Sequence, residues 1–312
     1  MDKTAYCNNR GFQRMQCAIS TDFLVWYGSP EPYLQYIAEA GFSHVFWCHQ
    51  WKSDFLYSSS EIDQIGRWLN IYNLKLLDIH ASCGIEKCWF SPVEYERKAG
   101  VELVLNRSVM LAELNPTGLG ALTMHIPETA ASQLTEQARL ELPAKIDALM
   151  RSLDELIPYL YKYGVKIAVE NSYSDDFQLI KRVLESYPAE CIGMTYDSGH
   201  GNMNECKGAE YLKAHLDRLE VLHLNDNNGV KDLHQPAGYG TLNWEELAGI
   251  LARSNYCKTG KPLSWEISMG NTPYINHELQ VNQKPESFRA FLQDCFQRCQ
   301  NFDRLVKAHI AE

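Results

Sequence analysis

The sequence lacks any apolar stretch long enough to cross a membrane, since a transmembrane helix needs about 18 or more consecutive apolar residues. The first six residues, MDKTAY, contain no apolar run of the kind that a secretory leader has. These absences predict a cytoplasmic protein with no membrane partner.

The sequence has no C-x-x-C motif, although it contains 10 cysteines among its 312 residues. The close pairs are Cys83/Cys88 and Cys295/Cys299, and their spacings fit structural zinc sites poorly. We therefore expect reduced cysteines that mostly pack in the interior.

Basic residues are in deficit, with 29 lysines and arginines against 39 aspartates and glutamates, for a formal charge of −10. A surface this acidic repels phosphate backbones, which makes nucleic acid a poor first choice of partner. The same imbalance arises when several carboxylates are collected around a cation.

Short apolar segments rich in β-formers alternate with longer segments of helical period. The predicted strands cover residues 15–21, 44–51, 75–80, 121–126, 165–170, 191–196, 220–224 and 263–267. The predicted helices cover residues 32–40, 60–72, 92–114, 135–163, 176–186, 209–219, 244–254 and 287–302. Eight such units predict one (β/α)8 TIM barrel over residues 1–312, with a doubly wound open sheet as the alternative.

Several catalytic signatures are absent as well. No G-x-S-x-G elbow occurs, no G-x-G-x-x-G follows the first predicted strand, and no lysine ends a strand. Serine hydrolases, dinucleotide-binding enzymes and Schiff-base aldolases therefore find no support in the sequence.

Ionisable residues instead gather at the carboxyl ends of six predicted strands, where enzymes of this fold carry their active sites. Taken singly, a histidine there is more often a hydrogen-bonded core residue, and a glutamate more often faces water. Clustered carboxylates, however, repel one another unless a cation neutralises them. We therefore predict a divalent metal site, for which mixed imidazole and carboxylate ligands favour Mn, Zn, Fe or Co over Ca. The residues are His80, His125, Glu170, Asp197, His200, His223 and Glu266.

Two long connections, residues 81–90 and 269–285, follow the third and eighth predicted strands. Loops of this length over a barrel mouth are often lids or binding loops. Aromatic residues near them can stack on the apolar face of a bound ligand, although packing is the commoner role. The candidates are Trp51, Trp89 and Phe90.

Five motifs in fixed order resemble the xylose isomerase-like TIM barrel superfamily. They are AVEN (168–171), YDSGH (196–200), HLNDNNG (223–229), DLHQPAGYG (232–240) and WEI (265–267). That superfamily contains sugar and sugar-phosphate isomerases and epimerases, and the apurinic-site endonucleases of the endonuclease IV type. The resemblance extends from about the first predicted strand to the last.

Carried over by position, the resemblance implies that Glu170, Asp197, His223 and Glu266 hold the shared metal, with Mn or Zn favoured over Co, Fe or Mg. It also implies that Glu170 and Glu266 move protons on opposite faces of the sugar through a metal-stabilised enediolate. His200 matches a substrate-orienting histidine. The implied protein is a metal-dependent carbohydrate isomerase or epimerase, and a homo-oligomer as family members often are.

The sequence departs from the epimerase pattern after the seventh predicted strand, where many ketose epimerases have an arginine and this chain reads Lys231-Asp232-Leu233-His234. Asp232 and His234, with His80 and His125, resemble the wider ligand set of the endonucleases, which use several zinc ions. Alternatives are therefore a sugar lyase or dehydratase using the same site, an endonuclease IV-like phosphodiesterase, a barrel that only binds its ligand, and a metal-free glycosidase.

Overall fold

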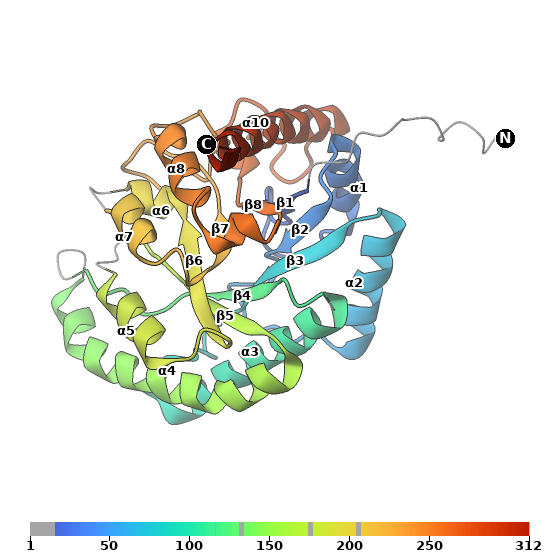
Figure 1. Ribbon diagram of the computed structural model, residues 1–312. Coiled ribbons are helices and arrows are strands. Elements are labelled where there is room, and N and C mark those ends of the chain that lie inside the picture. Colours follow the sequence, from blue (N-terminus) through green and yellow to red (C-terminus); the bar gives the residue numbers. More distant parts are fainter. Residues whose placement is uncertain (1–15, 116, 131–133, 174–176, 204–206, 312) are drawn as a thin grey trace.

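The computed structural model describes residues 16–115, 117–130, 134–173, 177–203 and 207–311. Eight parallel strands form one sheet in the order β7-β6-β5-β4-β3-β2-β1-β8, and helices surround it (Figure 1). The strands are β1 (Cys17–Ser20), β2 (His44–Trp47), β3 (Lys75–His80), β4 (Ala121–Met124), β5 (Lys166–Glu170), β6 (Ile192–Asp197), β7 (Leu219–His223) and β8 (Leu263–Trp265).

The sheet curls so that its first and last strands in this order, β7 and β8, meet. An isolated parallel bridge joins Leu224 to Trp265. Backbone hydrogen bonds run from Leu224 N to Ser264 O at 3.0 Å and from Glu266 N to Leu224 O at 3.1 Å. The predicted (β/α)8 barrel is confirmed, and the open doubly wound sheet is wrong.

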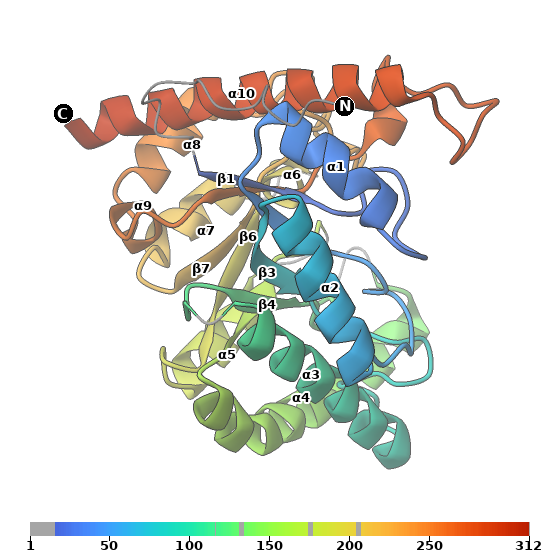
Figure 2. The ribbon, with the colours of Figure 1, turned by 90° about the vertical axis from the view of Figure 1, so that its right-hand side faces the viewer.

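The helices pack outside the strands, so the strands are buried on both faces. The long C-terminal helix α10 lies against α1 and α8 (Figure 2). No helix among the residues described is long and apolar enough to span a membrane. The helices are α1 (Glu31–Ala40), α2 (Ser59–Ile71), α3 (Glu94–Leu114), α4 (Glu136–Tyr163), α5 (Gln178–Ser186), α6 (Ser198–Asn202), α7 (Gly208–Ala214), α8 (Trp244–Leu251), α9 (Asn255–Lys258) and α10 (Pro285–Ala311), with a 3-10 turn η1 at Met269–Asn271.

Most element boundaries agree with the sequence patterns, and the differences have local causes. The strand predicted over residues 44–51 ends at Trp47, because the Thr21 hydroxyl accepts the backbone N–H of Cys48 and the chain then turns. The helix predicted over 209–219 ends at Ala214, and Leu219 instead begins β7 by pairing with Met194. The first residue of each of two predicted segments, Met15 and Asp176, lies outside the described residues.

A buried histidine beside the barrel mouth makes stability depend on pH. His49 is fully buried, its Nδ1 lies 3.1 Å from the Thr21 hydroxyl, and burial lowers its pKa to about 4. Because the unfolded chain takes up this proton near pH 6.5 and the folded chain does not, stability is lost as pH falls from 6.5 toward 4.

When the pH is lowered from 7 to 5, the free energy of unfolding should decrease by about 2 kcal/mol more in the wild-type protein than in His49→Gln. Denaturant titrations with a chelator present measure this difference without a contribution from metal release. His277→Gln, at an exposed position, serves as the control and should behave as wild type. Equal losses in wild type and His49→Gln would contradict the assignment.

Candidate metal centre

The carboxyl ends of the strands bring the predicted residues together at one mouth of the barrel. His80 ends β3, Glu170 ends β5, Asp197 ends β6 and His223 ends β7. The remaining residues follow strands closely, and together the set forms three groups whose ligand atoms lie within 4.8 Å of one another. The groups are His80/His125/Glu170, Glu170/Asp197/His223/Glu266 and Asp197/His200/His234.

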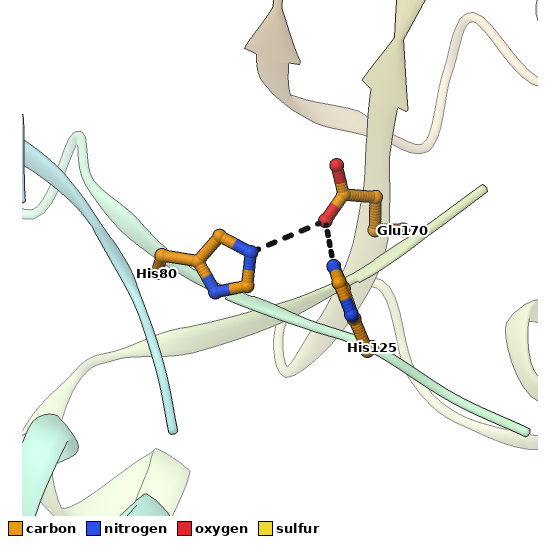
Figure 3. A group of neighbouring side chains, drawn as sticks. All are labelled: His80, His125 and Glu170. Carbon is orange, nitrogen blue, oxygen red and sulfur yellow. Dashed lines mark ion pairs between the residues drawn. The ribbon is translucent and has the colours of Figure 1, made fainter. Parts of the chain in front are cut away.

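The first group converges on one carboxylate oxygen (Figure 3). The Nε2 atoms of His80 and His125 lie 3.6 Å and 3.0 Å from Oε2 of Glu170. His80 and Glu170 are buried, while the side chain of His125 is about one-third exposed, at 37%. This group therefore opens toward solvent on the His125 side.

The second group contains the four ligands implied by the family resemblance, and all four are buried. Nδ1 of His223 lies 2.7 Å from Glu170 Oε1 and 2.9 Å from Glu266 Oε2. Glu170 belongs to this group and to the first, with a different oxygen facing each. One carboxylate thus links the two groups.

The third group shares Asp197 with the second. His200 Nδ1 is 3.8 Å from Asp197 Oδ1. The rim residue Asp232 lies 2.9 Å from His234 Nε2 and 3.4 Å from His200 Nε2. The structure therefore brings together every histidine and carboxylate that the sequence predicted, including the outer residues.

Hydrogen bonds orient the imidazoles. The Nδ1 atoms of His80 and His200 lie 3.3 Å and 2.8 Å from the backbone carbonyls of Ala81 and Asn171. A carbonyl oxygen accepts a hydrogen bond only from a protonated nitrogen, so Nδ1 carries the proton in both rings. When the ring is neutral, Nε2 is therefore unprotonated and can bind a cation. His223 is turned the other way, with Nε2 at 3.3 Å from the Thr123 hydroxyl and Nδ1 toward the carboxylates.

Two buried asparagines that the sequence analysis did not single out position Asp197. The side chain of Asn171 accepts from Asp197 N and donates to Asp197 O, at 2.8 Å and 3.0 Å. Asn225 Nδ2 donates to Asp197 Oδ2 at 2.8 Å. Asn171 lies in the AVEN motif and Asn225 in the HLNDNNG motif. The motifs therefore include both asparagines, whereas the pattern of ionisable residues at strand ends does not identify them.

Two further carboxylates near the site were also missed. Asp22, just after β1, is half-buried, and desolvation together with the charge of Glu266 raises its pKa to about 6. Asp226 is fully buried and accepts four hydrogen bonds, from Asn227 N, Gly238 N, Leu242 N and Trp244 Nε1 at 2.8–3.1 Å. These bonds close the loop that carries Asp232 and His234.

Burial and opposed charges set the protonation of the site. Burial disfavours a charged His223, but the carboxylates of Glu170 and Glu266 raise its pKa well above the ordinary value. Burial likewise opposes charge on His234, and Asp232 raises its pKa to about 9. Burial lowers the pKa of His80 to about 4. Against the effect of burial, the neighbouring carboxylates likewise raise the pKa of His200. Protons on His200, His223 and His234 thus offset the negative charge of the cluster, and a bound cation would displace them.

The donor atoms fit divalent cations. Glu170 Oε2 is buried and receives no hydrogen bond of acceptable geometry from any residue that the structure describes, although two imidazole nitrogens lie near it. A buried carboxylate oxygen without a donor is costly, and a cation between it and those nitrogens would remove the cost. Imidazole and carboxylate ligands suit Zn, Mn, Fe or Co. The residues present therefore fit the metal that the fold family implies.

A pocket of about 600 Å³ opens beside the cluster, within the size range of small-molecule sites. Glu170, His125, His200 and Asp232 contribute to its wall. Trp51 also lines it, and its ring lies 4.7 Å and 5.4 Å from those of His80 and His125, between centroids. Trp89 is fully buried and Phe90 half-buried, and neither is among the residues that line this pocket.

Comparison with known proteins shows the family of this chain. The family model described as "Xylose isomerase-like TIM barrel" matches residues 34–291. The uncharacterized protein y4fM of Sinorhizobium fredii is 28% identical over 286 residues, which are 84% of this chain and 88% of that protein.

Two further matches represent the two branches that the sequence motifs resemble. "Probable endonuclease 4" of Bacillus cytotoxicus is 26% identical over 199 residues, covering 55% of this chain and 64% of that protein. The solved structure of a D-psicose 3-epimerase in the presence of D-fructose superposes with a TM-score of 0.63 at 16% identity, covering 94% of this chain and 99% of the epimerase. At such identity the structural likeness shows the fold alone. The chain belongs to the xylose isomerase-like TIM barrel family.

Proposed function

We propose that this protein is a divalent-metal-dependent isomerase or epimerase acting on a sugar or sugar phosphate. The observation that carries the proposal is the convergence of two buried glutamates on one group beside a small-molecule pocket. Glu170 comes from β5 and Glu266 follows β8, and both carboxylates contact the same nitrogen of His223.

Glutamates that approach one point from two strands suit a proton transfer with two bases. One carboxylate removes the proton from the carbon beside a carbonyl, and the other returns a proton to the opposite face or to the neighbouring carbon. A divalent cation held by Glu170, Asp197, His223 and Glu266 would supply electrostatic stabilisation of the negative charge that develops on the substrate oxygens.

The pocket residues supply binding and orientation. The Trp51 ring presents an apolar surface at the wall, on which the carbon–hydrogen face of a sugar can stack. His200 lines the pocket too, and its Nδ1 contact with the Asn171 carbonyl fixes the ring. With the ring fixed in this way, His200 Nε2 faces Asp232. This nitrogen can bind a substrate hydroxyl group or a further cation.

The proposal is tested by proton exchange with solvent. Ketoses, aldoses and their phosphates incubated with the metal-loaded protein in heavy water should gain deuterium beside the carbonyl. Glu266→Gln is expected to reduce this exchange about 10³-fold, because general acid–base catalysis typically contributes 10²–10⁴-fold. NMR or mass spectrometry of the recovered sugar measures the exchange.

Glu102→Gln provides the matched control, because Glu102 is an exposed glutamate on α3. This variant should exchange protons at the wild-type rate. Absence of exchange across the whole substrate panel, with metal bound, would refute the isomerase proposal. Exchange followed by loss of water or by carbon–carbon cleavage would instead assign a dehydratase or lyase that uses the same site.

Hydrolysis of a phosphodiester is a second candidate, favoured by the two outer groups. His80 with His125, and His200 with Asp232 and His234, offer donors for cations beyond the central one. Metal analysis of the purified protein separates the candidates, since one ion per chain supports the isomerase and three support the hydrolase. Cleavage of DNA containing an abasic site, measured in parallel, tests the hydrolase directly.

A further inference from the structure

Two cysteines face each other beside the pocket, and one of them, Cys83, lines its wall. Cys83 and Cys88 lie in the loop between β3 and α3, with their sulfur atoms 3.7 Å apart. Cys83, Gly84 and Ile85 line the pocket beside the cluster of histidines and carboxylates. Neither thiol takes part in the proposed proton transfer or in any of the three donor groups.

Both ends of this loop are fixed to the barrel. The backbone N–H of Cys83 donates to Trp51 O at 3.1 Å. Next to Cys88, the buried Trp89 donates from its indole to His125 O at 3.0 Å. Gly100 allows α3 to pack closely against the backbone of Cys88, because a Cβ at Gly100 would lie 2.5 Å from the carbonyl carbon of Cys88.

The turn between the two thiols is short and closed. The backbone N–H of Gly84 donates to Lys87 O at 3.2 Å. The Asp54 carboxylate accepts from Glu86 N and Lys87 N, at 3.2 Å and 3.0 Å. With its ends and its turn held, the loop keeps the two sulfurs close together.

The pair differs in environment from most other cysteines. Among the described cysteines, Cys83, Cys88 and Cys257 are half-buried and the rest are buried. The hydrogen bond from the Cys83 thiol lowers the pKa of Cys88, while the same bond and burial raise the pKa of Cys83 well above its ordinary value. Since the thiolate is the reactive form, this direction favours Cys88 as the attacking sulfur and Cys83 as the resolving one.

We infer that Cys83 and Cys88 form a redox modification site that reacts with low-molecular-weight disulfides to give a reversible internal disulfide. The Cys88 thiolate attacks one sulfur of the disulfide, breaks its S–S bond and releases one thiol after protonation. Cys83 then loses its proton to solvent, attacks the Cys88 sulfur and expels the second thiol. Two protein thiols are oxidised, and the added disulfide is reduced to two thiols.

Closing the bond moves the pocket wall. A disulfide holds its sulfurs about 2.05 Å apart, so the 3.7 Å separation must shorten by roughly 1.7 Å. The backbone N–H of Cys83 is hydrogen-bonded to the carbonyl of Trp51, and the Trp51 ring packs on His80 and His125. The oxidation state of the pair therefore sets the shape of the pocket wall next to the cluster of histidines and carboxylates.

The test uses the 312-residue chain, reduced, desalted and incubated with glutathione disulfide at fixed metal content. Intact mass should fall by two hydrogens, and peptide mapping should join Cys83 to Cys88. Dithiothreitol should restore the original mass. Mapping also distinguishes this product from reaction at Cys7 or Cys206, which lie outside the described residues.

Single variants separate the two roles. Cys83→Ser should accumulate a glutathione adduct on Cys88, because the resolving thiol is gone. Cys88→Ser should react at Cys83 at least about tenfold more slowly. Cys257→Ser, the matched control at the other half-buried thiol, should still form the Cys83–Cys88 disulfide.

Stable glutathione adducts on wild type without an internal disulfide would overturn the inference. So would a disulfide that maps to other cysteines. The wild-type mapping does not depend on the folding of any variant and does not require catalytic activity. Its failure is therefore distinguishable from failure of the proposed function.

Discussion

Replacing Glu170 with glutamine is expected to remove cations from two groups at once and to lower turnover about 10³-fold. Glu170 presents Oε2 to His80 and His125, and Oε1 to His223. An amide keeps the shape of the side chain but loses the negative charge and one acceptor oxygen. Elemental analysis after dialysis, together with the proton-exchange rate, measures both effects.

Other substitutions should give a distinct pattern of metal loss. Asp197→Asn affects the second and third groups, because Asp197 belongs to both. His234→Asn affects only the third and is the matched control, and it should retain the ion held by Glu170, Asp197, His223 and Glu266. Full metal content in Asp197→Asn would show that the assigned groups are wrong.

Replacing Asp226 with asparagine is expected to lower the free energy of unfolding by about 4 kcal/mol. Each oxygen of this buried carboxylate accepts two of its four hydrogen bonds. An amide nitrogen in place of one oxygen leaves two buried donors unsatisfied, and each costs about 1–3 kcal/mol. Denaturant titration with a chelator present isolates this loss from any effect of metal binding.

The same substitution should loosen the loop that carries Asp232 and His234 and weaken cation binding there. Asn228→Ala is the control in the same loop. Asn228 is exposed, and its side chain accepts hydrogen bonds from the nearby backbone of Val230 and Lys231. If Asn228→Ala destabilises the protein as much as Asp226→Asn, the destabilisation does not come from the buried carboxylate.

The barrel and the location of the cluster could be predicted because both follow from local patterns. Apolar strand segments alternate with helical segments, which indicates roughly where each strand ends. Parallel strands then place all their carboxyl ends on one side. His80, Glu170 and His223 each end such a segment, so their convergence follows from the fold.

Element boundaries were less predictable where one residue satisfied two patterns. Leu219 continues the apolar period of the helix that precedes it, yet it pairs with Met194 as the first residue of β7. The pairing of adjacent strands determines the outcome there, and that pairing depends on residues distant in the sequence.

The sequence by itself determined the alternation of eight strands with helices and most of the histidines and carboxylates at the barrel mouth, since each depends on residues close together along the chain. Only the tertiary structure decided that Glu170 and Asp197 are shared between groups, that Asn225 holds Asp197, and that Asp226 closes the outer loop. It also decided that Cys83 faces Cys88 beside the pocket. These contacts depend on how loops that follow different strands pack against one another. The spacing of residues within one loop does not specify that packing.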